Sequence, residues 1–184
     1  FRYVRGDSAL SGFDLREYLD RFPDVCRSKF GRAYNFAALE RDFDQLRAGK
    51  RWLVARDVLK LFEPTRTPFG RYWASPPERD LDAALKKNHF YMSPAPSDRE
   101  LTERLLVILH NIGVASLMLS FVHPERFGVF STPVVNLLQI HRPTTVDLYT
   151  AYCNELGEWQ KHFHLDSVAD TSTALWTFHE LTWG

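Results

Sequence analysis

Two apolar segments joined by a short turn constrain the fold of this chain more than any other sequence feature. The segments are LLVIL (residues 105–109) and VASLMLSFV (residues 114–122), and Asn111, Ile112 and Gly113 lie between them. Apolar residues recur at spacings of three and four positions and strict alternation is scarce, which is typical of helices. The sequence therefore predicts a helical hairpin, followed by a proline-bounded loop and a helix that restarts at residues 131–133.

The same spacing predicts helices on both sides of the hairpin. We expect Pro23 and Gly157 to end two of them, and Asp170 or Thr171 to cap the last. The expected helices are 13–22, 36–48, 51–62 (with a strand over 51–55 as the alternative), 78–87, a hairpin helix that starts at a Ser97 capping box, the second hairpin helix, 132–139, 143–156, 158–163 and 172–181. The predicted fold class is all-α, one compact multi-helix domain over residues 1–184. A division into two lobes, 1–96 and 97–184, is left open.

Charge and apolar content narrow the classes of function. The sequence has no run of about 18 uncharged apolar residues, the length that a membrane span requires. We therefore expect no membrane partner. Lysine plus arginine equals aspartate plus glutamate at 23 each, but residues 111–184 hold three basic side chains against seven acidic ones. A surface that binds nucleic acid should therefore draw its cations from the first 110 residues, notably Arg47, Lys50 and Arg51.

Cysteine and histidine usage predicts the compartment and argues against a metal site. Cys26 and Cys153 lie far apart, and the first residues lack the apolar block of an export signal, which favours a reducing, cytoplasmic (intracellular) location. His162 and His164 are two positions apart, so they do not share a helix face as ligands. We expect no metal, and the absence of a phosphate-binding glycine motif predicts no cofactor.

Three segments beyond the turn point to one family. They are HPERFGVFS (residues 123–131), YTAYC (149–153) and ALWTF (174–178). Together with the hairpin they resemble the helix-hairpin-helix DNA glycosylase superfamily, and the resemblance covers residues 97–184. It implies a compact helical glycosylase fold, in which the backbone amides of Asn111, Ile112 and Gly113 bind DNA phosphates.

Two positions depart from the family's catalytic pattern. Ser131 stands where the family places a catalytic aspartate, and Ala115 stands where its strand-cutting members place a lysine. Neither residue type can supply a carboxylate or a Schiff base. We interpret Ser131 as a helix cap, and Asn111, which replaces the first glycine of the turn, as a residue that tolerates positive φ.

These departures leave three hypotheses for the function. The first is a DNA-binding module without ordinary glycosylase chemistry, which reads unusual or modified DNA. The second is a protein-interaction module of a larger assembly, favoured by the neutral charge and the many aromatic residues. The third is a glycosylase with a relocated carboxylate, for which Glu103, Asp147 and Asp166 are the candidates.

Overall fold

The structure is a computed structural model that describes residues 13–32, 34, 36–48, 53–61, 76–87 and 97–184. These residues form nine α-helices and no strand, so the all-α prediction is confirmed for this part of the chain. The helices are α1 (Leu15–Phe30), α2 (Phe36–Arg47), α3 (Ala55–Leu61), α4 (Glu78–Lys87), α5 (Asp98–Leu109), α6 (Ile112–Val122), α7 (Thr132–Leu137), α8 (Thr145–Phe163) and α9 (Val168–Trp183).

Helix α1 passes through Pro23, which the sequence analysis expected to end it. The proline ring holds φ near the helical value, so its cost is mainly the lost N–H donor and a clash with the preceding turn. Packing on α9 offsets that cost: Phe22 and Phe30 contact the ring of Trp176 with centroids 5.7 and 6.4 Å away. The helix ends instead at Gly31, whose φ of 75° is the left-handed conformation that glycine adopts without strain.

Helix α8 likewise continues through Gly157, where the sequence analysis expected a stop and a separate short turn. A glycine inside a helix costs about 1 kcal/mol relative to alanine. Leu156 and Trp159 on either side are buried, and this apolar burial exceeds the penalty. The helix ends at His164, which has a φ of 53°.

Side-chain caps set the starts of the later helices. The hydroxyl of Ser97 accepts from the amide of Glu100 at 3.2 Å, as the capping-box prediction required. Helix α9 starts earlier than expected, because Ser167 caps it by accepting from the amide of Asp170. Neither Asp170 nor Thr171 is the cap. The carboxylate of Asp170 instead accepts a hydrogen bond from the Ser167 hydroxyl at 2.7 Å.

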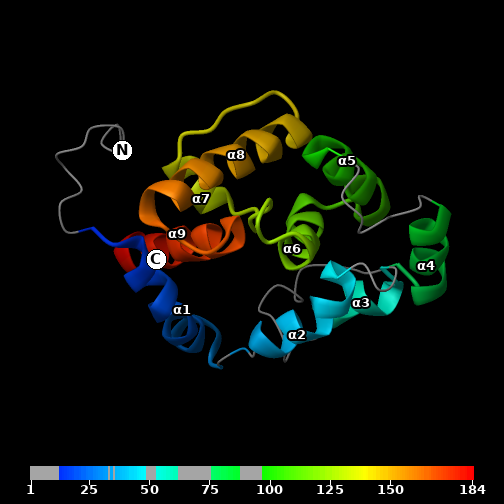
Figure 1. The fold of residues 1–184 in the computed structure, drawn as a ribbon, viewed down its shortest axis with the longest axis horizontal. Helices are drawn as coiled ribbons and strands as arrows, with labels where there is room; N and C mark the ends of the chain where they lie inside the picture. Colours follow the sequence, from blue (N-terminus) through cyan, green and yellow to red (C-terminus); the bar gives the residue numbers. More distant parts are fainter. Residues whose placement is uncertain (1–12, 33, 35, 49–52, 62–75, 88–96) are drawn as a thin grey trace.

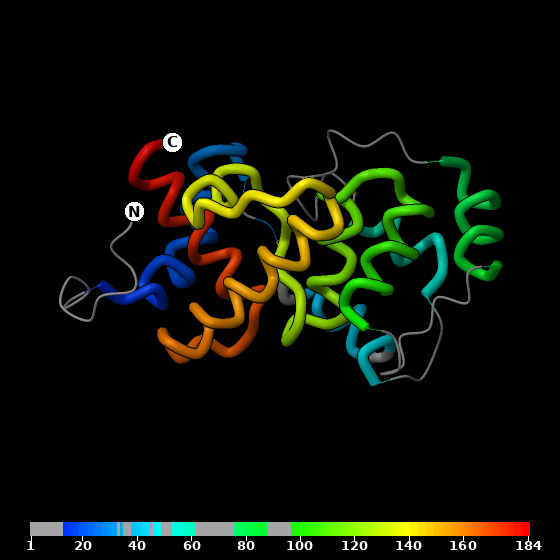
Figure 2. The backbone as a smooth tube through the Cα atoms, turned by 90° about the horizontal axis from the view of Figure 1, so that it is seen from above, coloured from blue at the N-terminus to red at the C-terminus, as the bar shows by residue number. Residues whose placement is uncertain are grey.

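The helices form two groups that do not follow their order along the chain (Figures 1 and 2). Helix α1 packs against α9, at the other end of the chain, and α7 and α8 also contact α9. Helices α5 and α6 lie with α2, α3 and α4 in the second group. Contacts between helices therefore cross residue 96, where the open two-lobe division would fall.

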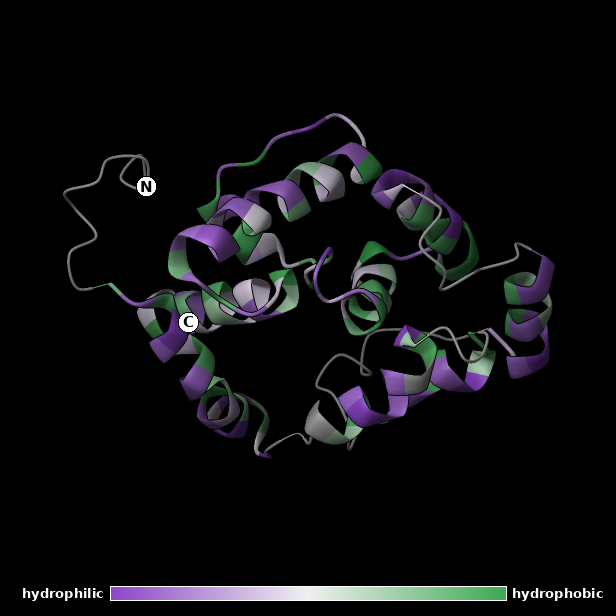
Figure 3. Cartoon of the chain, viewed as in Figure 1, coloured by the Kyte–Doolittle hydropathy of each residue, from purple (hydrophilic) through white to green (hydrophobic). Residues whose placement is uncertain are grey.

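Helix α6 of the second group also contacts α9 of the first, and it is hydrophobic along its length (Figure 3). Every residue from Val114 to Val122 is buried, because α2, α3, α5 and α9 all contact this helix. It is too short to cross a membrane, and none of the other described helices combines the length and apolar character that a crossing requires.

Candidate functional site

A cleft of about 1020 Å³ lies between the two groups of helices. Residues of α1, α2, α6, α7 and α9 line it, together with residues of the loop from α6 to α7. Five aromatic side chains contribute to its lining: Phe22, Tyr34, Phe121, Phe130 and Trp176. The cleft therefore has the apolar walls and the volume of a small-ligand site.

Two buried tyrosines of α8 hold the carbonyl groups of the loop before Ser131. Tyr149 donates its hydroxyl to the carbonyl of Gly128, and Tyr152 donates to that of Val129, each at 2.8 Å. Burial raises the pKa of both phenols well above their ordinary value, so both stay protonated as donors. The carbonyls are thereby satisfied without water.

Two buried serines hold the amides of the same loop. The amide of Val129 donates to Ser172 of α9 at 3.0 Å, and that of Phe130 donates to Ser116 of α6 at 2.9 Å. Ser116 in turn donates its hydroxyl to the carbonyl of Gly113 at 2.9 Å, which joins this loop to the hairpin. Side chains from α6, α8 and α9 therefore fix the backbone that carries Ser131 into the cleft.

Ser131 occupies the N-cap position of α7, but its side chain makes no capping hydrogen bond. The cap prediction is therefore right for the position of Ser131 and wrong for its hydroxyl, and the residue also lines the cleft. Thr132 is the first residue of the helix, followed by Pro133. Ala115 is fully buried in α6 and is not part of the cleft lining.

Two carboxylates that the sequence analysis did not select line the cleft: Asp170 of α9 and Glu40 of α2. Asp170 is half-buried, and Glu40 is exposed. The sequence offered Asp170 only as a candidate cap of the last helix, and a helix cap carries no information about a cleft. Among the described residues, no arginine or lysine side chain forms an ion pair with either carboxylate.

The three carboxylates predicted from the sequence lie outside the cleft. Glu103 pairs with Arg99 at 2.9 Å on the surface of α5. Asp147 accepts from the Thr144 hydroxyl and from Arg99, and these contacts lower its pKa below the ordinary value. Asp166 is exposed over 81% of its side chain, 3.6 Å from Arg16. None of the three lines the cleft beside Ser131.

The hairpin turn, defined here as His110–Gly113, differs from its predicted geometry. The residue with positive φ is His110, at 54°, whereas Asn111 is extended at −148°. Asn111 caps α6 by accepting from the amide of Val114 at 3.2 Å. The amides of Ile112 and Gly113 then begin the helix, where first-turn amides have no intrahelical acceptor.

The surroundings of the hairpin turn hold little described positive charge. A shallow pocket of about 730 Å³ beside it is lined by Glu103, His110, Val146 and further residues of α5, α6 and α8, with no arginine or lysine among them. The side chain of Arg47 hydrogen-bonds the Glu40 carbonyl and Asp44. Lys50 and Arg51, the other predicted DNA-binding cations, lie outside the described residues.

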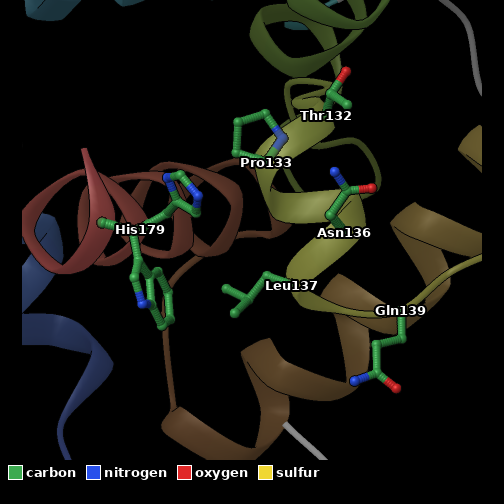
Figure 4. A pocket seen from close by; sticks show the side chains of 7 residues that line it. Thr132, Pro133, Asn136, Leu137, Gln139 and His179 are labelled. Carbon is green, nitrogen blue, oxygen red and sulfur yellow. The ribbon is translucent and has the colours of Figure 1, made fainter.

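A smaller pocket of about 430 Å³ lies between α7 and the C-terminal part of α9 (Figure 4). Thr132, Asn136, Gln139 and His179 bring polar groups to it. The Nδ1 atom of His179 is buried without a hydrogen-bond partner, 3.7 Å from a carboxylate oxygen of Glu180. The pocket is small, and it shares Thr132 and Pro133 with the cleft.

Metal and thiol chemistry find no support in the described part of the chain. No group of three or more histidine, cysteine, aspartate or glutamate side chains there is placed to hold a metal ion. Cys26 and Cys153 are buried free thiols, and burial raises the pKa of each to about 12. Both stay neutral at physiological pH, so neither is a nucleophile.

Comparisons of the chain with protein-family models, with curated proteins and with solved structures give no match. The candidate site therefore depends on the geometry alone.

Proposed function

We propose that this protein binds DNA and holds an unpaired base in the cleft, without the carboxylate chemistry of the family that the sequence resembles. The observation that carries the proposal is the cleft itself. Its aromatic side chains, among them Phe22, Phe121 and Trp176, offer faces and edges for a planar ring. Ser131 stands on the fixed loop where a reacting carboxylate would be needed.

The hairpin turn supplies the second part of the proposal. The amides of Ile112 and Gly113 point out of the N-terminus of α6, where a phosphate is favoured by the unpaired N–H groups and by the helix dipole. Ser116 connects this turn to the cleft loop through its bonds with Gly113 and Phe130. A strand held at the turn would keep its register relative to the cleft.

A proline substitution at Ile112 tests the phosphate contact. Proline is favoured at the first position of a helix, and Asn111 already has the extended backbone that a residue before proline requires. Ile112→Pro therefore removes one amide donor while the helix start is retained. Ile112→Ala is the matched control, because it removes a similar amount of side chain and keeps the N–H.

We expect the proline variant to bind a duplex with one unpaired nucleotide roughly tenfold more weakly than the alanine variant, as for one hydrogen bond to a charged group. Fluorescence anisotropy at low salt measures this, and affinity should fall steeply as salt rises. Equal affinities would remove the hairpin turn from the DNA site. No binding to any DNA at low salt would overturn the proposal and favour the protein-interaction hypothesis. In that case Val107, which is 65% exposed beside the turn, would be part of the protein-binding surface.

A second candidate function is base excision with Asp170 as the carboxylate. It is favoured by one observation: Asp170 lines the same cleft as Ser131. A carboxylate there would activate water or stabilise the positive sugar as the base departs. Incubation with a panel of damaged duplexes tests this, since Asp170→Asn should abolish base release and Asp166→Asn should not. Absence of release by the unmodified protein across the panel would contradict it.

A further inference from the structure

Four hydroxyl groups that line the cleft already donate their protons within the protein. Ser120, Ser172 and Thr173 each donate their hydroxyl to a backbone carbonyl within their own helix, at 2.8 to 3.0 Å. Ser167 donates to the carboxylate of Asp170. A hydroxyl has one proton and two acceptor lone pairs. Ser167 and Ser172 each use one lone pair for a backbone amide and keep one, so all four groups still have an acceptor for a ligand.

Two amides at the N-terminus of α9, which also lines the cleft, already have acceptors within the protein. The amide of Ala169 donates to the carbonyl of Pro124 at 3.0 Å, and that of Asp170 donates to Ser167 at 3.0 Å. The helix brings the Asp170 carboxylate to the cleft in their place. A negatively charged ligand would therefore meet repulsion at this helix end.

Helix α1 adds an acceptor of a different kind. Pro23 has no N–H, so the carbonyl of Leu19 loses the donor that normally lies four residues further on. Leu19 and Pro23 both line the cleft. The carbonyl of Leu19 thus lacks its usual helical donor in a part of α1 that lines the cleft.

The charges of the cleft point the same way. Its charged lining residues are Asp170 and Glu40, and no lysine, arginine or histidine is among the described residues that line it. Lys29 lies 5.7 Å from the ring centre of Trp176, but it is bound to the buried carboxylate of Glu180 and is not in the lining. The cleft therefore combines aromatic walls with a net negative charge.

From these four features we infer that the cleft selects a planar ring that donates hydrogen bonds or carries positive charge, and rejects acidic or carbonyl-rich rings of the same shape. This inference rests on the proposed function in taking the cleft as the ligand site. For a base held there, it names an amino-bearing or cationic ring as the preferred class. Stacking on the aromatic walls would supply affinity for any planar ring, and the Asp170 carboxylate would supply the preference for a donating or cationic one.

Three planar probes of nearly equal shape test the selection: benzamidine, a cation; benzamide, which is neutral; and benzoate, an anion. Isothermal titration calorimetry with the whole chain should give a dissociation constant for benzamidine that is lower than that for benzamide, with benzoate weakest. The expected preference for benzamidine over benzamide is roughly tenfold to a hundredfold, as for one charge-assisted hydrogen bond. Equal affinities, a preference for benzoate, or no binding of benzamidine would overturn the inference.

The variant Asp170→Asn tests whether the carboxylate of Asp170 causes the preference for benzamidine over benzamide. The asparagine side chain can still accept a hydrogen bond from the Ser167 hydroxyl, so the helix start is kept while the negative charge is removed. We expect the benzamidine preference to fall at least about tenfold, with benzamide affinity unchanged. Asp166→Asn is the matched control, since it removes the same charge from an exposed side chain just before α9.

The same probe series on the Asp166 variant should match the unmodified protein. An unchanged preference in the Asp170 variant would contradict the role of this carboxylate. None of these titrations contains DNA, so their failure is distinguishable from failure of the DNA-binding assay with the Ile112 variants.

Discussion

The hairpin turn and the loop that carries Ser131 are stabilised in opposite ways. Asn111 closes the hairpin turn with a bond to the amide of Val114, three residues away. The loop that carries Ser131 is held by Tyr149, Tyr152 and Ser172, which come from helices much further along the chain. One region depends on its own sequence, and the other depends on the assembled protein.

This difference predicts how each region responds to substitution. Changes at the hairpin turn should be local, and they should leave the cleft intact. A substitution around the loop should both reduce the global stability of the protein and displace Ser131. Ser116 is the exception because it bonds to both regions, through Gly113 and Phe130.

Gly128→Ala should have the largest effect on the loop side of the comparison. A Cβ atom there would lie 2.4 Å from Leu156 Cδ1 and 2.8 Å from Ser172 Cβ, so buried side chains and the loop must shift. We expect the free energy of unfolding to fall by about 3 kcal/mol, measured by urea denaturation. The control is Gly157→Ala, where nothing lies within 4 Å, and which should stabilise α8 by about 0.5–1 kcal/mol. Equal stabilities of the two variants would break the comparison.

Tyr149→Phe comes next in expected size. It leaves the carbonyl of Gly128 buried without its donor, at a cost of about 2 kcal/mol, while the ring is kept. Tyr152→Phe should behave alike at Val129, and both variants should weaken benzamidine binding as the loop relaxes. If both variants keep the free energy of unfolding of the unmodified protein, water replaces the two hydroxyl groups and α8 does not fix the loop.

Asn111→Ala tests the hairpin side of the comparison. Loss of the cap should cost about 1 kcal/mol, and Asn111→Ser should restore most of it because serine also caps helices. Benzamidine affinity should stay unchanged in both variants, since the turn does not line the cleft. A change in that affinity would show that the two regions are coupled, with Ser116 as the connection.

The smallest expected effect is a pH dependence at His123, where the loop begins. Burial lowers the pKa of this histidine, and the nearby carboxylate of Glu125 partly offsets the shift. The folded protein therefore resists protonation more than the unfolded chain does. Stability should be complete above about 6.5, the ordinary histidine value, and decline as the pH falls below it. Thermal melts from pH 8 to 5 measure this, and His123→Phe should flatten the profile; an unaltered profile would assign the decline to other groups.

Local signals were enough to predict part of this molecule. The hairpin and the Ser97 cap follow from residues within a few positions of one another, and the structure contains both. The errors at Pro23 and Gly157 share one cause, since packing between distant helices outweighs the local preference to stop. The same limit hid Asp170, because only the packing of α9 against α1 and α6 places it in the cleft with Ser131.

The packing of α1 against α9 also bears on how the protein is made. Tyr18 and Phe178 meet edge to face with ring centres 5.1 Å apart, although they lie near opposite ends of the described chain. During synthesis α1 leaves the ribosome before α9, so its aromatic face has no partner helix until α9 is made. During that time the aromatic face of α1 is open to chaperones and to aggregation, and the cleft lacks the residues that α9 contributes.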